Sequence, residues 1–78
     1  MGRYYFHLYD DMIVMDEEGA DFSDPAAARQ RALKIAREMA CAEVLAGHLD
    51  LSHRIEVVDE HSEPVATVHF GDTVQVRH

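Results

Sequence analysis

The chain has little of several residue types, and each shortage excludes a class of protein. Its single cysteine, Cys41, excludes an internal disulfide framework. Only 7 lysine and arginine residues stand against 15 aspartate and glutamate residues, so the formal net charge is -8. A chain of that charge is repelled by nucleic-acid backbones and by anionic membrane surfaces. We therefore expect neither nucleic acid nor membrane among its partners.

Long apolar runs are also missing. No apolar stretch approaches the roughly 20 residues of a transmembrane helix, and the first residues resemble a strand more than a signal peptide. With the single cysteine, this favours a cytoplasmic protein. A length of 78 residues and an apolar fraction of 47% predict one globular domain over residues 1–78. Within it, residues 71–78 form a loose tail or a short extra strand.

Catalytic chemistry has no recognisable set of residues in this sequence. No nucleophile, base and orienting group can be assembled, and no glycine-rich phosphate loop is present. Cys41 falls on the polar side of a predicted helix, without the activating base that a catalytic thiol needs. The sequence therefore predicts a protein that is not an enzyme and holds no cofactor.

Six histidines are the most numerous candidate metal ligands. His48 and His53 are five positions apart with Asp50 between them, but a stable zinc site needs three or four converging ligands. We interpret the histidines at 48, 53, 61 and 78 as exposed loop residues and predict no metal site. The alternative function, a small-ligand or metal-binding protein that uses surface histidines, stays open.

Strand periodicity is clearest near the start of the chain. In "RYYFHLYD", Tyr4, Phe6 and Leu8 alternate with Tyr5, His7 and Tyr9, which is the pattern of a strand. After a turn at Asp10 and Asp11, "MIVM" returns as a short strand. The segment "DEEGADFSDP" has no period and predicts an exposed turn. Residues 54–59 and 64–70 alternate as a second hairpin, with a polar turn at 60–63.

A long helix separates the two hairpins. Ser23 or Asp24 can cap it, Pro25 suits its first turn, and Gly47 can end it. Winding residues 26–46 at 100° per residue gives one broad apolar arc. Its members are Ala28, Ala32, Leu33, Ile35, Ala36, Met39, Ala40 and Val44. We predict that Ile35 and Met39 pack against the sheet.

These elements predict an α+β domain with the order β-β-α-β-β, in which one long helix packs on one face of a small antiparallel sheet. The inward residues would be Tyr4, Phe6, Leu8, Ile55, Val57, Ala66, Val68 and Phe70. The outward residues would be Tyr5, His7, Tyr9, Glu56, Val58, Val65, Thr67 and His69. A bulge or a twist in the first strand could still turn Tyr5, His7 or Tyr9 into the core.

The outward face is more apolar than a solvated sheet face requires. The bland interpretation is ordinary strand propensity. The functional interpretation is a protein contact, since tyrosine is enriched in interfaces. Stacking of RNA bases on these aromatic side chains would need basic residues around them. The patch has none of that basic surround and has the acidic Glu56 in its middle, so RNA binding is not expected. Our main hypothesis is an interaction module, with a regulatory role as one use, that forms a homodimer or binds an unidentified protein through this face or an edge strand. The candidate interface residues are Tyr5, His7, Tyr9, Val58, Thr67 and His69.

Charge is unevenly distributed along the chain. Residues 1–24 carry a net charge of -6, residues 25–47 carry +2, and residues 48–78 carry -4. The helix is therefore the one positive element of an acidic protein. It can attract acidic turns within the molecule or across an oligomer.

Three segments, "RYYFHLYD", "DEEGADFSDPAAARQRALKIARE" and "RIEVVDEHSEPVATVHF", resemble a family of short alphaproteobacterial proteins classed as a domain of unknown function. The likeness rests on an Arg-Tyr-x-Phe-His-Leu start and an Asp-Glu-Glu-Gly turn, which match Arg3–Leu8 and Asp16–Gly19. This sequence has Asp11 and Ser62 where the family often has glycine. The resemblance implies a bacterial, cytoplasmic, single-domain protein, and it brings no catalytic residue.

Overall fold

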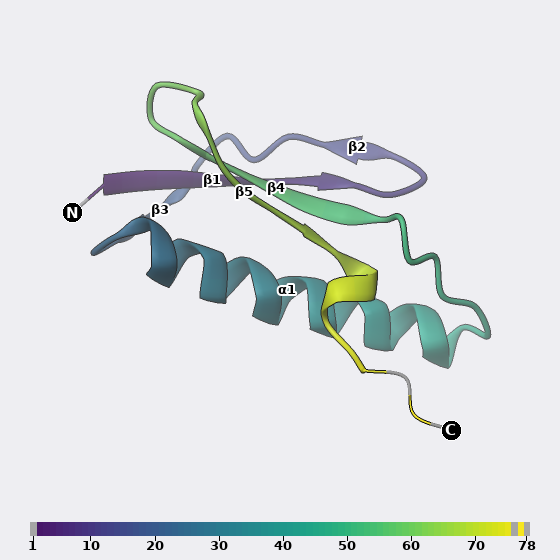
Figure 1. Ribbon diagram of the computed structural model, residues 1–78. Helices are drawn as coiled ribbons and strands as arrows, with labels where there is room; N and C mark the ends of the chain where they lie inside the picture. Colours follow the sequence, from purple (N-terminus) through teal and green to yellow (C-terminus); the bar gives the residue numbers. More distant parts are fainter. Residues whose placement is uncertain (1, 76, 78) are drawn as a thin grey trace.

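The computed structural model describes residues 2–75 and 77. The elements are β1 (Gly2–Tyr9), β2 (Ile13–Val14), β3 (Ala20–Phe22), α1 (Pro25–Leu45), β4 (Arg54–Asp59), β5 (Pro64–His69) and a 3₁₀ turn (Phe70–Asp72). The antiparallel strands follow the order β2-β1-β4-β5, and β3 also pairs with β1. Figure 1 shows α1 lying along one face of this sheet. The predicted α+β fold with the order β-β-α-β-β is confirmed.

Strand β3 is an addition to that prediction. The segment expected to be an exposed turn pairs Ala20–Phe22 with Gly2–Tyr4, so β1 carries two short partners along one edge. The ring of Phe22 packs edge-on against Phe6, with 5.7 Å between the ring centroids. Three residues are too few to show an alternating pattern, so only pairing with β1 defines this strand.

The assignment of side chains to the two sheet faces is largely confirmed. Ile55, Val57, Val68 and Phe70 are buried on the helix side. Val65, expected to face outward, packs against the core instead. The register explains this error, because Val57 pairs with Ala66 while Val58 pairs with Pro64. Val65 is therefore the extra residue of a β-bulge, which turns its side chain inward.

Both ends of α1 follow the predicted capping signals. The Asp24 carboxylate accepts a hydrogen bond from the Ala27 N–H at 2.8 Å, and Pro25 occupies the first helical position. At the other end, Gly47 adopts a left-handed φ of 94°, which a residue without a side chain tolerates best. Local sequence alone thus sets the length of the helix.

The contact between α1 and the sheet is made by alanine. Ala28, Ala32 and Ala36 have no exposed surface, and Ala40 is also buried. Ile35 and Met39, predicted to be the central contacts, are only half-buried beside this row. Val44, placed on the apolar arc, is 57% exposed. A methyl side chain brings the helix close to the strands, so larger neighbours can only flank the contact.

The chain beyond β5 is pinned to the helix. Phe70 is fully buried, and the backbone oxygen of Thr73 accepts a hydrogen bond from Nε of Arg37 at 3.0 Å. Residues 73–75 and 77 form no strand, and positions 76 and 78 lie outside the described residues. The described helices include none with the length and apolar character to span a membrane.

The alanine contact predicts that a larger side chain destabilises the protein at a buried helix position but not at an exposed one. Replacing Ala36 by leucine should lower the free energy of unfolding by about 1–3 kcal/mol, because the helix would have to move away from the sheet. Replacing the exposed Ala26 by leucine is the matched control and should change it by less than about 0.5 kcal/mol. Denaturant unfolding measures both, and equal effects would show that the helix is not closely packed there.

Candidate functional site

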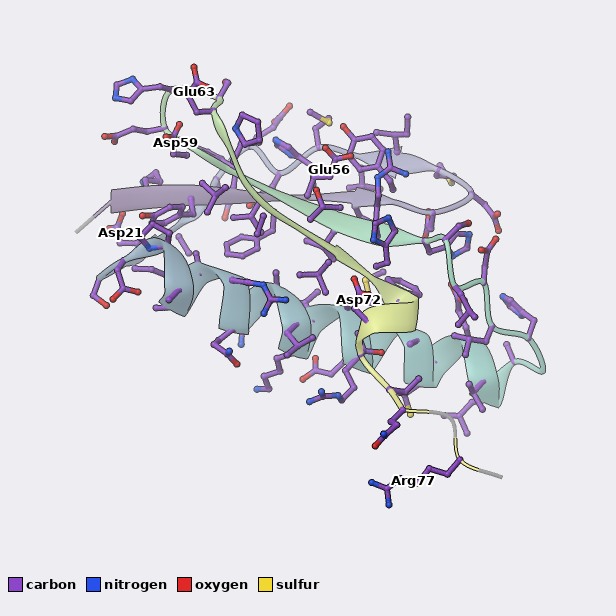
Figure 2. All side chains as sticks on the ribbon, in the orientation of Figure 1. Asp21, Glu56, Asp59, Glu63, Asp72 and Arg77 are labelled. Atoms are coloured by element: carbon purple, nitrogen blue, oxygen red, sulfur yellow. The ribbon has the colours of Figure 1, made fainter. Side chains whose placement is uncertain are left out.

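The outward sheet face forms three cross-strand rows. His7, Glu56 and Thr67 lie side by side across three strands, as do Tyr9, Arg54 and His69; Tyr5 pairs with Val58. Figure 2 shows Glu56 on the face opposite the helix. All six predicted interface residues thus lie in these rows, and no described helix covers their side of the sheet (Figure 1).

Charged side chains occupy the middle of this face. Nε of Arg54 contacts the Glu56 carboxylate at 2.8 Å, and the guanidinium lies 4.4 Å from the centroid of the Tyr9 ring. A cation over an aromatic face is attracted by the ring quadrupole. His7 and His69, both predicted to face outward, lie on β1 and β5 with β4 between them. The face is therefore a polar and aromatic surface with no histidine pair.

A hydrogen-bonded clip holds the turn between β2 and β3 against β1. The Asp16 carboxylate accepts hydrogen bonds from the N–H groups of Phe6, Glu18 and Gly19, each at 3.1 Å. Partial burial raises the pKa of this carboxyl, but the three donors outweigh burial, so its pKa lies below the ordinary 3.8. Nδ1 of His7 accepts from the Asp16 N–H at 3.0 Å. His7 is thereby committed to this turn.

Arginine and glycine complete the clip. Arg3 donates to the Glu18 carbonyl at 2.6 Å and forms an ion pair with Asp21. Gly19 has a φ of 68°, and a β-carbon there would lie 2.7 Å from the Tyr4 carbonyl oxygen. Four residues that carry the sequence resemblance, Arg3, His7, Asp16 and Gly19, therefore have internal structural roles. Ser62, in the turn between β4 and β5, also adopts a left-handed φ of 62°.

Substitution of the two left-handed glycines, Gly19 and Gly47, distinguishes the cost of a steric clash from the cost of backbone strain. Gly47→Ala should cost about 1–2 kcal/mol, the penalty of a left-handed alanine, because nothing lies within 4 Å of the added carbon. Gly19→Ala should cost clearly more, because the same penalty is joined by a clash with the β1 backbone. Thermal unfolding of both variants measures the difference. A smaller loss at position 19 than at 47 would mean that the clip is loose.

His53 is the main correction among the histidines. Predicted to be an exposed loop residue, it has a side chain that is only 9% exposed, 2.6 Å from Glu43 at Nδ1. Its Nε2 lies 3.2 Å from an Asp50 oxygen and 3.5 Å from an Asp11 oxygen. The ring also packs edge-on against Phe70. This residue joins α1, the loop after it, the β1–β2 turn and the 3₁₀ turn.

Charge in this cluster shifts three pKa values. The hydrogen bond to Glu43 raises the pKa of His53 above the ordinary 6.5, against the effect of burial. Burial raises the pKa of Glu43, but the Asp50 N–H and His53 outweigh it, so it lies below 4.5. Hydrogen bonds from Ser52 hold the pKa of Asp50 below 3.8. The carboxylates of Glu43, Asp50 and Asp11 thus favour the protonated form of the His53 imidazole that lies between them.

These directions predict how stability depends on pH. The His53 contribution is complete below pH 6.5 and is lost as the pH rises through the higher folded pKa. The Glu43 and Asp50 contributions are present above their unfolded values and are lost as the pH falls through the lower folded ones. The unfolding temperature should therefore be highest between about pH 4.5 and 6.5, since both contributions are present there.

Substitution identifies the group responsible. His53→Gln keeps a hydrogen-bond donor but cannot titrate, so its unfolding temperature should be lower than that of the parent and should fall less above pH 6.5. His61→Gln, in an exposed turn, is the matched control and should keep the parent profile. An unchanged alkaline slope in His53→Gln would assign the pH dependence to another residue.

The other candidate ligands are dispersed. His48 and His61 are exposed, as predicted, and His78 lies outside the described residues. Cys41 is also exposed, on the polar side of α1. Over residues 2–75 and 77, no three histidine, cysteine or carboxylate side chains converge in a way that would hold a metal ion. Both His53 ring nitrogens face carboxylates within the protein.

A groove of about 320 Å³ lies between α1 and the β1 edge of the sheet. Its apolar lining is Phe6, Leu8, Phe22, Ile35, Met39 and Ile55. Asp16 lines its sheet side and Arg31 its helix side. A second cleft of about 280 Å³ continues past Met39 toward Ala46 and His48. The two hollows follow one flank of the helix.

Exposed apolar side chains also occupy the β1–β2 hairpin at the edge of the sheet. The run Met12–Met15 is 53–71% exposed in each of its residues. Val14 pairs with Leu8 and so points to the same sheet face as Leu8, which lines the groove. The sequence identified this run only as a short strand. Its exposure arises because the helix makes its main contacts with β4 and β5 rather than with β1 and β2.

The comparisons with known proteins give a family without an assigned activity. The model of DUF6894, a domain of unknown function, matches residues 3–71. No curated protein and no solved structure matches the chain. The resemblance seen in the sequence thus extends over almost the whole fold.

Proposed function

The chain belongs to the DUF6894 family, and we propose that its domain is a non-enzymatic interaction module that associates with a second copy of itself. One observation carries the proposal: the helix makes its main contacts with β4 and β5, which leaves a groove beside β1, and the adjoining edge strand β2 carries exposed apolar side chains, Val14 on the inner face and Ile13 on the outer face. Contiguous exposed apolar surface marks interaction sites. A second, identical chain could bury this apolar surface.

The described side chains support a non-enzymatic role. The buried histidine is held between carboxylates on both ring nitrogens, and the cysteine lies on the opposite, polar side of the helix. His7 accepts a backbone hydrogen bond and so has one nitrogen engaged. A catalytic site needs a nucleophile, a base and an orienting group within reach of one substrate position. These residues serve structural contacts instead.

The outward sheet face is the second surface available for association. Tyr5, His7, Tyr9, Val58, Thr67 and His69 keep their proposed role there, either toward a second copy or toward an unidentified protein. Tyrosine suits an interface because its ring buries area while its hydroxyl stays hydrated. The charged Arg54 and Glu56 in the middle of the face make it the more polar of the two surfaces.

The alternative function is binding of a metal or small ligand by surface histidines. His48 lines the second cleft with Asp10 and Glu43, which is the arrangement closest to such a site. Glu43 is already bonded to His53 and to the Asp50 N–H. Self-association therefore has the better support.

Sedimentation equilibrium tests the proposed function. We expect a mass of twice the 8.8 kDa chain at micromolar concentration, because each copy leaves apolar surface to be buried. The double variant Tyr5→Ser, Tyr9→Ser measures how much the outward sheet face contributes to dimerisation. Loss of the dimer in a folded double variant would assign the contact to that face. A parent protein that stays monomeric at millimolar concentration would reject self-association.

A further inference from the structure

We infer that the groove between α1 and β1 is filled by a second copy of this chain, related by a twofold axis parallel to the groove, with Arg31 of each copy facing Glu17 and Glu18 of the other. The inference rests on the proposed self-association and assigns it a surface. Three observations carry it: an uncovered apolar floor, an apolar rim that can enter the partner's groove, and walls of opposite charge.

The apolar floor is a consequence of where the helix lies. Because the buried alanines hold α1 against β4 and β5, the flank with Ile35 and Met39 overhangs β1 without closing on it. Phe6 and Leu8 form the other side of the same hollow. Met39 lines both the groove and the adjoining cleft, so the surface continues along the helix. An apolar surface of this length favours a protein partner over a small ligand.

The edge strand β2 supplies the apolar side chain that would enter the groove of the second copy. Val14 is 53% exposed, lies on the inner face beside Leu8, and belongs to the edge strand β2. The twofold operation places Val14 of one copy over Ile35 and Met39 of the other. A standard interface covers about 800 Å² of each partner, roughly 15% of the 5353 Å² surface of this chain. The groove, the cleft and β2 together extend along the molecule and can provide such a patch.

The charges on the two walls of the groove favour a second copy of this chain as the molecule that occupies it. Arg31 lies on the helix wall, whereas Asp16 lies on the sheet wall and is followed by the exposed Glu17 and Glu18. Among residues 2–75 and 77, no carboxylate comes within 4.0 Å of Arg31. A twofold axis along the groove exchanges the walls, so each basic wall meets an acidic one. A peptide of one sign would meet a like charge on one wall, so the surface is best matched by itself.

A charge-swap experiment tests the pairing. Arg31→Glu should weaken dimerisation at least about tenfold, because two like-charge contacts replace two favourable ones. Glu17→Lys with Glu18→Lys should weaken it similarly for the same reason. In an equimolar mixture, however, both contacts have opposite signs again. We therefore expect the two variants, each monomeric alone at a concentration where the parent is dimeric, to form a heterodimer when mixed.

Matched variants control for net charge. Arg29→Glu makes the same change of charge at an exposed helical residue that does not line the groove. Glu60→Lys with Glu63→Lys does so at the exposed β4–β5 hairpin, which Figure 2 shows at Glu63. Both controls should leave the dissociation constant within about twofold of the parent, since charges far from the contact are screened. Circular dichroism confirms that each variant is folded.

The outcomes separate this inference from the proposed function. A dimer that persists in both groove variants, or one that is lost only on changing Tyr5 and Tyr9, overturns the groove assignment and leaves self-association standing. Equal weakening by Arg31→Glu and Arg29→Glu, or a mixture that stays monomeric, also overturns the pairing. A parent that never dimerises rejects the proposed function, and the inference with it.

Discussion

The close approach of four alanines to the sheet is the constraint on which the rest of the structure depends. Ala28, Ala32, Ala36 and Ala40 are the buried residues of α1, and Leu33, Ile35 and Met39 pack partly buried against the same core. The small volume of the alanines brings the helix backbone near β4 and β5, which lets Ile55, Val57 and Val68 fill the remaining space. The main contacts of the helix are with these two strands, and Phe6 and Leu8 of β1 are only partly buried beside it. The closed core and the open groove therefore have one cause.

The amount that could be predicted depends on how local each signal is. The Asp24 cap, the left-handed Gly47 and the alternation of β1 and β4 are encoded within a few residues, and all were predicted correctly. The inward turn of Val65 depends on a register shift between two strands. The sequence of β5 alone does not reveal this register shift, because its alternation of side chains looks regular on both sides of Val65.

The site residues show the same division. The burial of His53 depends on Glu43, ten residues earlier, and on Asp11 in another hairpin. Nothing within the loop distinguishes it from the exposed His48 or His61. The positions of Tyr5, His7 and Tyr9 could be predicted by parity, whereas the Arg54 contact with Tyr9 required the β1–β4 register. The groove could not be predicted at all, because it reflects the lateral position of the helix on the sheet.

The Asp16 clip also determines which backbone groups of β1 are open to another strand. An exposed strand edge offers a row of unpaired N–H and carbonyl groups to any other strand. Along the outer edge of β1 that row is interrupted: β2 takes one end, β3 takes the other, and between them a carboxylate rather than a backbone occupies the Phe6 N–H. At the opposite edge, β5 begins with Pro64, which has no N–H to donate, and contains the Val65 bulge. Neither border presents a long, regular template for continuous sheet growth. The surfaces that remain open to another molecule are therefore formed by side chains rather than by backbone edges.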